Sequence, residues 1–372
     1  MAERARGRRI LIVLAAGEAY PSGFVRALIY KDHFERAGFE VRYVSRLFPP
    51  LIRFLDAPPR PLWRVMSVGL AALLYRLASA VAVISDAVIV RLAKGYDVVY
   101  MSKVTSRRLV TKLRAKTRAR LVLDFGDALW LRGRGKEFQK VLAQVDAVTT
   151  DNEVTASYVR PVNPRCTVIA DCPQVEWFDR RRAAGRRGGG DVVTVGWIGT
   201  PGTVHNLFVV WEALERLFQR HPNLHLRLVG VGPDRSRLPP FEKVRYSIRS
   251  RYSRDEMIDE VFGMDIGLFP LQDVEASRVR GVLKATVYMA GEAVVVCSPV
   301  GQCADLIQDG VNGLLAGSTE EWEAKLELLL TNPDLRARIA QHALQTVRRD
   351  FTVDRSFAQL LDVLATNRSA SR

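Results

Sequence analysis

The chain has 372 residues, of which 48% are hydrophobic and 26% are charged, and its formal net charge is +15. This composition is that of a globular protein rather than a disordered one, and single cores stop growing near ~250–300 residues, so two domains or more are predicted. Residues 1–175 hold 29 Lys and Arg against 15 Asp and Glu, whereas residues 191–372 hold 21 against 23. The basic first half predicts an anionic partner, namely a membrane surface, a phosphorylated acceptor or nucleic acid, unless the charge only aids solubility.

The four cysteines form no metal-binding pattern. Cys166, Cys172, Cys297 and Cys303 show neither CxxC nor Cys/His ligand spacing. Two of them lie in or beside apolar strands. We therefore expect a reduced, cytoplasmic protein.

The most membrane-like stretch is Trp63–Leu92, which four charged residues interrupt. Because no uncharged run reaches ~18 residues, we predict one or two helices that lie on a surface or pack in a core and do not span a bilayer. The basic start of the chain leads into turn residues without a clear cleavage site. We therefore expect no signal peptide.

The first half opens with the pattern of a βαβ unit, which predicts a parallel sheet. The expected elements are a strand at Arg9–Ala15, a helix at Phe24–Gly38 and a strand at Glu40–Val44. The loop after the first strand carries Gly17, Ser22 and Gly23, but it has no GxGxxG fingerprint of a dinucleotide site. We expect this loop to contact a ligand, or simply to turn the chain.

Strands and helices continue to alternate up to residue 171. The expected elements are a helical segment at Trp63–Lys94, a strand at Tyr96–Tyr100, a helix at Ser106–Lys116, and strands at Arg120–Asp124, Val145–Thr149 and Val168–Asp171. Asp124 and Asp127 stand where one strand ends, the position at which open α/β sheets bind ligands. Either can orient or deprotonate an acceptor hydroxyl, although Asp127 can equally cap a helix that starts near Ala128.

An Arg- and Gly-rich stretch, Phe178–Gly190, is predicted as a linker between two domains, 1–177 and 191–350. After it the alternation restarts. The expected elements are strands at Val192–Ile198, Leu224–Val229, Ile266–Phe269 and Val294–Cys297, a short strand from Val244, and helices at Asp255–Gly263, Leu283–Ala290, Glu320–Leu330, Pro333–Arg349 and Phe351–Leu364. The order predicts two doubly wound α/β domains that face each other across a cleft.

Two segments of the second half suit a phosphorylated ligand. The loop GTPGT places Gly199, Thr200, Gly202 and Thr203 between a strand and a helix, without the GK[ST] of a Walker A loop. Glycines let the backbone approach a phosphate or a sugar hydroxyl closely, although a tight turn has the same pattern.

The second segment starts a helix at Lys284, after a loop that holds Glu275. A cation at a helix N-terminus suits a diphosphate leaving group, whose charge grows in the transition state. His205 is the histidine placed to touch a ligand, and Gly301 is expected to face the same cleft. No metal-ligand or Ser/His/Asp constellation stands out.

Taken together, these segments resemble the GT-B glycosyltransferases of family 4, in the bacterial branch with a DFDDA-like motif. The motifs read DFGDA at Asp124–Ala128, WIGTPGT at Trp197–Thr203, KATVYMAGEAVVVCSPVG at Lys284–Gly301 and LIQDGVNGLLA at Leu306–Ala316. They occur in the family's order over nearly the whole chain.

The resemblance implies two Rossmann-like domains and retaining transfer of a sugar from a UDP- or GDP-linked donor, with no metal or other cofactor. Residues 199, 200, 202, 203, 205, 275, 284 and 301 would bind the donor, and Lys284, Asp127 and Asp124 would act in catalysis. The acceptor, a glycan or a polyprenyl-phosphate-linked sugar, would bind the first domain near Gly17, Ser22 and Gly23, at the inner face of the cell membrane. No specific nucleic acid is expected, and a final helix at 351–366 would pack on the first domain.

This chain departs from the family pattern at three places. Val287 and Val279 stand where the family has carboxylates, Gly126 replaces one acid of DFDD, and His205 and Asn206 replace an Arg/Lys pair. An inactive sugar-nucleotide-binding protein is therefore an alternative, as is a nucleotide-sugar epimerase of the same fold. A nucleic-acid-binding protein is a third alternative, which only the charge supports.

Overall fold

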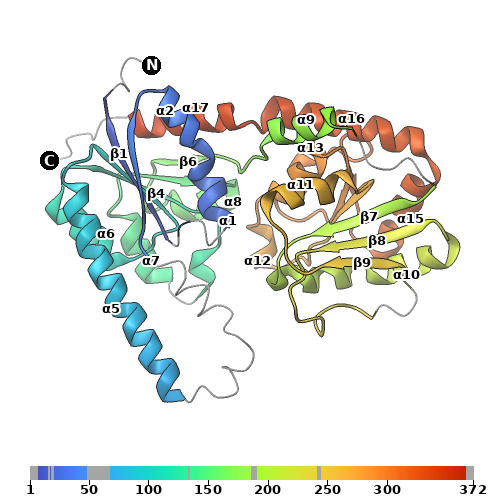
Figure 1. Ribbon diagram of the computed structural model, residues 1–372, viewed down its shortest axis with the longest axis horizontal. Helices are drawn as coiled ribbons and strands as arrows, with labels where there is room; N and C mark the ends of the chain where they lie inside the picture. The colour runs from blue at the N-terminus through green and yellow to red at the C-terminus, as the bar shows by residue number, and fades with distance from the viewer. Residues whose placement is uncertain are drawn as a thin grey trace. The chain divides into compact units, whose positions relative to one another are not determined.

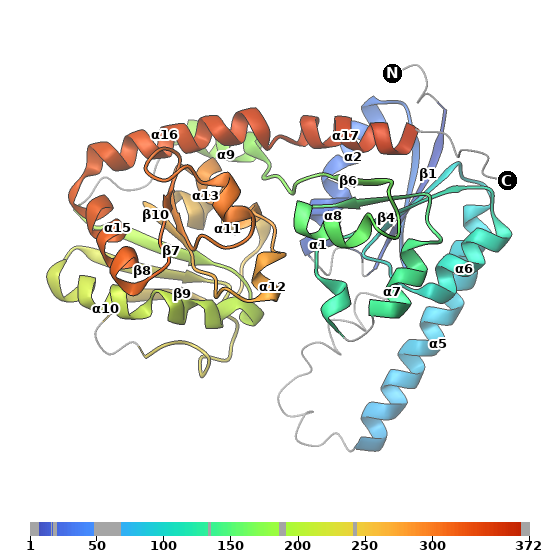
Figure 2. The same cartoon turned by 180° about the vertical axis from the view of Figure 1, so that it is seen from behind.

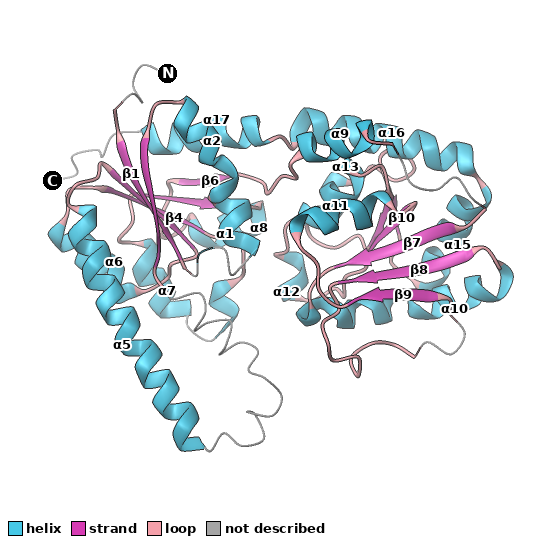
Figure 3. Ribbon diagram, viewed as in Figure 1, coloured by secondary structure: helices cyan, strands magenta, loops and turns pink. Residues whose placement is uncertain are grey.

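The computed structural model describes residues 7–15, 17, 21–47, 68–132, 135–185, 191–240 and 244–365, and Figures 1 and 2 show it from opposite sides. Residue contacts divide the chain into two compact units, Met1–Ile169 with Ser356–Arg372, and Ala170–Arg355. Each unit contains a parallel sheet of six strands with helices around it (Figure 3). The predicted fold class, α/β with two Rossmann-like domains, is confirmed.

The first sheet has the strand order β2-β1-β3-β4-β5-β6. Its strands are β1 (Arg9–Leu14), β2 (Glu40–Ser45), β3 (Val98–Ser102), β4 (Arg120–Asp124), β5 (Ala147–Thr150) and β6 (Cys166–Val168). The order reverses between β1 and β3, so the crevice at the carboxyl ends of these two strands is where a doubly wound sheet binds its ligand. Every residue of β3 and β4 is buried, as expected for central strands of a parallel sheet that are covered on both faces.

Helices of the first unit pack on both faces of this sheet. They are α1 (Pro21–Arg26), η3 (Leu28–Tyr30), α2 (Lys31–Arg36), α5 (Val68–Ala93), α6 (Arg107–Lys116), η4 (Leu129–Arg132), α7 (Gly135–Leu142) and α8 (Glu153–Val159). Apolar residues of α5, α6 and α7 share one buried core with β1, β3 and β4. Of the predicted helical segment Trp63–Lys94, residues 63–67 lie outside the described residues.

The helix predicted at Phe24–Gly38 is broken into α1, η3 and α2. The break lies at Ala27, whose φ of −144° is outside the helical region. The Tyr100 hydroxyl donates a hydrogen bond to the Arg26 carbonyl at 2.9 Å, so this carbonyl has a partner outside the helix. The break leaves the Arg26 side chain directed at the buried end of β4.

The second sheet has the order β12-β11-β10-β7-β8-β9. Its strands are β7 (Val193–Ile198), β8 (Leu224–Val229), β9 (Tyr246–Arg249), β10 (Ile266–Phe269), β11 (Val294–Cys297) and β12 (Leu314–Leu315). Here the order reverses between β7 and β10. The loops that follow these two strands therefore form the ligand-binding edge of the second unit.

Two apolar cores cover the two faces of the second sheet. The helices that supply them are α9 (Val175–Ala183), η5 (Pro201–Val209), α10 (Trp211–Arg220), α11 (Arg254–Phe262), α13 (Leu283–Ala290), α14 (Gln302–Leu306), α15 (Thr319–Thr331) and α16 (Pro333–Asp350). A short helix, α12 (Glu275–Arg278), lies between β10 and α13. The predicted helix Leu283–Ala290 and strands Ile266–Phe269 and Val294–Cys297 have the same bounds as α13, β10 and β11.

The stretch predicted as a linker begins as a helix. Phe178 of α9 is buried, and its ring lies 5.8 Å from that of Phe262. Arg182 donates to Glu292 and to the Ala290 carbonyl, both at 2.9 Å. These contacts fix α9 on the second unit, and the boundary between the units falls after Ile169 rather than at residue 177. Residues 186–190 of the predicted linker lie outside the described part of the chain.

The last helix, α17 (Val353–Ala365), returns the chain to the first unit. The Phe357 ring lies 5.0 Å from the Phe34 ring in an edge-to-face contact and 5.9 Å from that of Tyr30. Arg8 donates hydrogen bonds to the carbonyls of Leu364 and Ala365, both at 3.3 Å. The two ends of the described chain therefore meet beside the first sheet.

Candidate functional site

The GTPGT loop follows β7 at the point where the strand order of the second sheet reverses. A Cβ at Gly199 would lie 2.5 Å from the Trp197 ring, and one at Gly230, whose φ is +84°, would lie 2.1 Å from the Gly199 carbonyl oxygen. These two positions therefore require glycine, because a side chain at Gly199 would collide with Trp197 and one at Gly230 would collide with the backbone of Gly199. The two glycines let the loops after β7 and β8 pack closely against each other and against the Trp197 ring.

The two threonines of this loop close its turn. The Thr200 amide donates to the Thr203 hydroxyl at 3.3 Å, and this hydroxyl donates to the Thr200 carbonyl at 3.0 Å. Gly202 is exposed, and a Cβ there would meet only the Thr200 hydroxyl, at 4.0 Å. The loop thus has a fixed shape and an open face at Gly202.

Asn206 connects the loops after β7 and β10. Its side-chain amide donates to the Thr203 carbonyl at 3.2 Å, and its side-chain oxygen accepts from the Gln272 amide at 3.3 Å. Asn206 is buried, whereas the neighbouring His205 is exposed. The reversal point of the second sheet is therefore held together by a buried amide, and an imidazole stands at its surface.

Lys284 lies in the first turn of α13, which follows the β10 loop. Its ammonium nitrogen is 4.6 Å from the centre of the Trp197 ring and 5.0 Å from that of Phe269. Burial among apolar groups, together with nearby Arg280, lowers the pKa of Lys284 from 10.5 to about 7. Within the described residues no carboxylate pairs with it. A desolvated cation that lies over two aromatic faces, with no carboxylate partner among the described residues, is suited to an incoming anion.

Gly301 and Glu275 complete the predicted donor residues. Gly301 precedes α14 with a φ of +57°, and a Cβ there would lie 2.4 Å from the Arg278 carbonyl oxygen. Glu275 is exposed in the first turn of α12, where Asp273 and Arg278 form a bidentate ion pair. Gly301 thus brings the loop after β11 into contact with the segment that holds Glu275.

Val287, at the position where the family pattern has a carboxylate, is a core residue. It is 6% exposed and belongs to the apolar cluster between the sheet and α13. Val279 is 4% exposed. Neither position contributes a polar group to the edge of the sheet.

In the first unit, Asp124 forms a buried ion pair with Arg26. The guanidinium contacts the carboxylate at 2.5, 3.1 and 3.2 Å, and Thr149 donates to the same carboxylate at 2.7 Å. Asp124 is 0% exposed. This geometry ties α1 to β4 and β5, which suits a supporting role for Asp124 beneath the edge of the sheet.

Asp127 is exposed at the same edge. Its carboxylate pairs with the Lys103 ammonium at 2.6 Å. Lys103 follows β3 and has a φ of +56°, a left-handed conformation that costs a side-chain-bearing residue free energy and is typical of functional edges. Asp127 and Lys103 therefore present a charged pair beside the reversal point of the first sheet.

The loop predicted to meet the acceptor is compact where the structure describes it. Gly17 has a φ of +57°, and a Cβ at Gly23 would lie 2.4 Å from the Gly17 carbonyl oxygen. Ser22 lies in α1, and its side chain is outside the described atoms. Gly17 and Gly23 thus bring the end of β1 against the first turn of α1, beside the reversal point.

Sequence patterns assigned no role to four polar residues of these edges: Arg26, Lys103, Asp151 and Asn206. Asp151 follows β5, and a Cβ at Gly126 would lie 2.7 Å from its carboxylate carbon. A polar residue directly after a buried strand was the available signal for Lys103 and Asp151. Arg26 and Asn206 lie within helical segments, where sequence spacing does not reveal an inward side chain.

Two features are absent from the part of the chain that the structure describes. No group of three or more His, Cys, Asp or Glu side chains is arranged to hold a metal ion there. None of the described helices is both long and apolar enough to cross a membrane.

Several solved structures are similar to this chain over nearly its whole length. A glycosyltransferase from Rickettsia africae ESF-5 has a TM-score of 0.69 at 14% identity, covering 96% of this chain and 97% of that one. Alr3699/HepE from Anabaena in complex with UDP-glucose has a TM-score of 0.62 at 15% identity, with coverages of 96% and 99%. Sucrose-phosphate synthase from Thermosynechococcus elongatus has a TM-score of 0.67 at 14% identity, with coverages of 96% and 98%.

Sequence comparisons identify a family for part of the second unit. No curated protein sequence matches the chain significantly. Residues 190–332 match the family model described as Glycosyl transferases group 1. The chain therefore carries a Glycosyl transferases group 1 domain in its second unit, and its two units together have the GT-B fold of the glycosyltransferases above.

Proposed function

We propose that this protein is a retaining glycosyltransferase of the family 4 type, with a nucleotide sugar as donor. The observation that carries the proposal is Lys284, a desolvated cation without a carboxylate partner among the described residues, at the reversal point of a sheet. A donor pyrophosphate beside Lys284 would replace the missing counter-charge. The matching Anabaena structure, which contains UDP-glucose, supports a UDP-linked donor.

The donor would bind across the loops of the second unit. Gly202 and the backbone around it would approach the phosphates, His205 and Glu275 would lie at the surface of the site, and Gly301 would bring the β11 loop close. Thr200 and Thr203 would act by holding the turn. Because Val287 is a core residue, it cannot bind the donor ribose. Among the proposed donor residues, Glu275 is the carboxylate that would bind the ribose instead.

In the proposed reaction the bond between the anomeric carbon and the leaving phosphate oxygen breaks. The acceptor oxygen forms its bond to that carbon on the same face, and its proton passes to the departing phosphate. Lys284 would offset the charge that develops on the phosphate. Asp127 would orient the acceptor near Gly17 and Gly23, and Asp124 would support this edge from below.

The acceptor is proposed to be a glycan or a polyprenyl-phosphate-linked sugar at the cytoplasmic face of the cell membrane. Val81, Ile84 and Val88 form an exposed stripe on α5, and Ile84 is 65% exposed. Exposed Arg91 continues the same stripe. An apolar stripe that ends in a cation, on the basic half of the chain, suits the interface of an anionic membrane.

The test compares Lys284→Ala with the wild type in release of UDP or GDP from a panel of nucleotide sugars. We expect turnover to fall at least tenfold, the scale of losing one electrostatic contact to a leaving group. The matched control is Lys325→Ala, which removes the other described lysine of the second unit. Unchanged turnover in Lys284→Ala would remove Lys284 from the mechanism.

A second candidate is a protein that binds sugar nucleotides without catalysing transfer. The buried Val287, where the family pattern has an acid, favours it. Thermal-shift measurements with UDP and GDP separate the two candidates, because binding to the folded state raises the melting temperature whether or not turnover follows. Stabilisation by a nucleotide together with zero transfer or hydrolysis would support this second candidate.

A further inference from the structure

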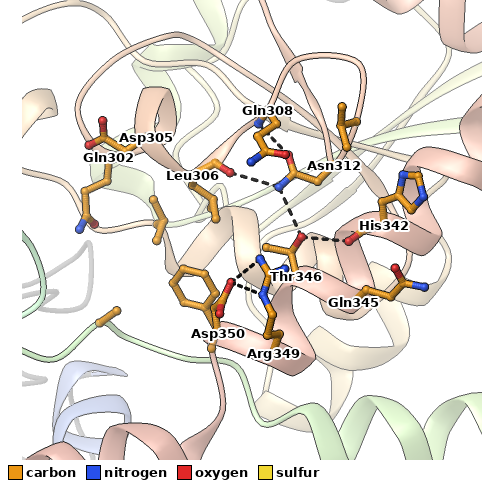
Figure 4. Close-up of a pocket in the computed structure, with 14 residues that line it drawn as sticks. Gln302, Asp305, Leu306, Gln308, Asn312, His342, Gln345, Thr346, Arg349 and Asp350 are labelled. Atoms are coloured by element: carbon orange, nitrogen blue, oxygen red, sulfur yellow. Dashed lines mark hydrogen bonds and ion pairs between the residues drawn. The ribbon is translucent and has the colours of Figure 1, made fainter.

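The second unit contains a cavity of about 550 Å³ that shares no lining residue with the proposed donor residues. Its walls come from α16, from α14 and from the turn that follows α14 (Figure 4). Its volume lies within the range of small-molecule sites, ~300–1,000 Å³. This size admits a compact ligand.

Hydrogen bonds between side chain and backbone hold one wall of the cavity in place. The buried side chain of Asn312 accepts from the Gln308 amide at 2.8 Å and donates to the Leu306 carbonyl at 3.2 Å and to the Thr346 hydroxyl at 3.4 Å. The Thr346 hydroxyl donates in turn to the His342 carbonyl at 3.0 Å. These bonds connect the turn after α14 to α16, so the shape of the cavity is fixed before any ligand arrives.

Several polar side chains of the lining remain available to a ligand. Gln345 and His342 lie on α16, and Gln308 lies in the turn that follows α14 (Figure 4). Within the described residues, none of these three side chains is hydrogen-bonded to the protein. Two amides and an imidazole supply both donors and acceptors, which is the complement of a hydroxyl group.

The charge of the lining distinguishes it from the donor edge. It holds two carboxylates, Asp305 and Asp350, and one guanidinium, Arg349, which is bound to Asp350 at 2.8 and 3.0 Å. The cavity is therefore neutral to slightly negative. Such a lining opposes phosphates, whereas Lys284 favours them.

We propose that this cavity binds a neutral saccharide, distinct from the donor sugar. Amides, an imidazole and a free carboxylate would bond its hydroxyls. Phe351 and Leu306, which also line the cavity, would cover its apolar C–H face. The inference depends on the lining alone and does not require the protein to catalyse transfer.

Binding is measured directly, by ligand-observed NMR and calorimetry on the full chain without nucleotide. The probes are neutral sugars (glucose, galactose, mannose, N-acetylglucosamine, maltose, cellobiose and lactose), with glucuronate and glucose 6-phosphate as anionic comparators. We expect at least one neutral sugar to bind with a Kd of about 10 mM or tighter, roughly −3 kcal/mol or better. The anionic comparators should bind more weakly than it does.

Variants assign the binding to the cavity. Gln345→Ala should weaken it about two- to tenfold, the effect of one lost hydrogen bond, and Gln345→Trp should abolish it by filling the space. Gln341→Ala is the matched control, because Gln341 is exposed on the same helix and does not line the cavity. Lys284→Ala should leave it unchanged.

Three results would overturn the proposal. One is the absence of binding for the whole neutral panel, and another is tighter binding of the anionic comparators. The third is binding that survives Gln345→Trp but is lost in Lys284→Ala, which would place the sugar at the donor edge.

Discussion

The Asp151 carboxylate occupies the space that a side chain at Gly126 would fill. A Cβ at Gly126 would lie 2.7 Å from both the carboxylate carbon and one oxygen of Asp151. Asp151 is 5% exposed, and its other oxygen accepts from the Asn152 side chain at 2.6 Å. The DFGDA segment has glycine at its third position, where the family pattern has an acid. The Asp151 carboxylate, from the end of β5, thus lies where the side chain of that acid would begin.

Gly126→Ala should therefore destabilise the first unit. The added methyl forces Asp151 out of its buried position, and overpacking of this kind costs about 1–3 kcal/mol. Denaturant unfolding measures the loss. The double variant Gly126→Ala/Asp151→Ala should recover most of it, because the two side chains compete for one space. Gly135→Ala is the control, since its Cβ would meet nothing nearer than 3.6 Å. Equal effects at both glycines would contradict the prediction.

Breaking the Arg26–Asp124 pair should cost far more than breaking an exposed pair. Asp124→Asn removes the carboxylate charge that faces the buried Arg26 guanidinium, for which a loss of about 3–5 kcal/mol is expected. The comparison is Glu137→Gln, because Glu137 and its partner Arg107 are both about half exposed and such pairs contribute roughly 0–1 kcal/mol. Unfolding free energies of the two variants decide the matter. A loss below about 1 kcal/mol for Asp124→Asn would show that the pair is not needed for stability.

Nucleotide affinity should fall as the pH rises above 7. The free Lys284 ammonium has a pKa of about 7 and loses its proton above this pH, whereas a bound pyrophosphate holds the proton on. Binding then takes up a proton, and the Kd for UDP or GDP should rise by up to about tenfold per pH unit between pH 7 and 9. Calorimetry at three pH values measures it. The slope should disappear in Lys284→Arg, because a guanidinium stays charged throughout. The same slope in Lys284→Arg would assign the titration to another group.

Removing the Lys284 charge should stabilise the fold. The pKa of this lysine is about 7 when folded and 10.5 as its ordinary value, so the unfolded chain binds more protons between these pH values. Below pH 7 Lys284 is charged in both states, and the folded protein bears the full free-energy cost of burying its ammonium. Between pH 7 and 10.5 the folded protein loses this proton while the unfolded chain keeps it, so the free energy of unfolding rises with pH. Lys284→Met should raise stability at pH 7 by about 0.5–2 kcal/mol, with a flatter pH dependence. Lower stability at pH 7 in this variant would refute the idea that desolvation dominates.

The α5 stripe should carry part of any membrane affinity. Ile84→Glu should weaken binding to vesicles that contain anionic lipid by about tenfold, because burying an isoleucine contributes about 1.5–3 kcal/mol. Flotation of vesicles with the protein measures the bound fraction. Val154→Glu is the control, since Val154 is an exposed apolar residue of the same unit on α8. Equal loss in both variants would indicate a general charge effect and no specific stripe.

The sequence predicted most sheet strands well, because their signal is local, although the strand expected at Val168–Asp171 lies at Cys166–Val168. Arg120–Asp124 and Leu224–Val229 have the bounds of β4 and β8, since buried apolar runs with branched side chains have few other structures open to them. The prediction of one continuous helix at Phe24–Gly38 was wrong, because the structure divides this segment into α1, η3 and α2. Its break depends on Tyr100, which is 74 residues from Arg26. No local pattern contains that partner.

Contacts at the candidate site were harder to predict for the same reason. Lys284 was found as a helix-start cation, but its aromatic neighbours Trp197 and Phe269 come from two different strands. The match of Gly126 with Asp151 requires the register between β4 and β5. Donor and acceptor roles therefore remain predictions for the experiments above.

The return of α17 to the first unit has a consequence during translation. Phe357, which covers Phe34 and Tyr30, is synthesised only after all of Ala170–Arg355. The nascent chain must therefore hold an aromatic surface uncovered while the intervening unit, whose residues are contiguous, is free to fold first. A message truncated near codon 352 would yield a second unit with nearly all of its residues and a first unit that lacks its covering helix.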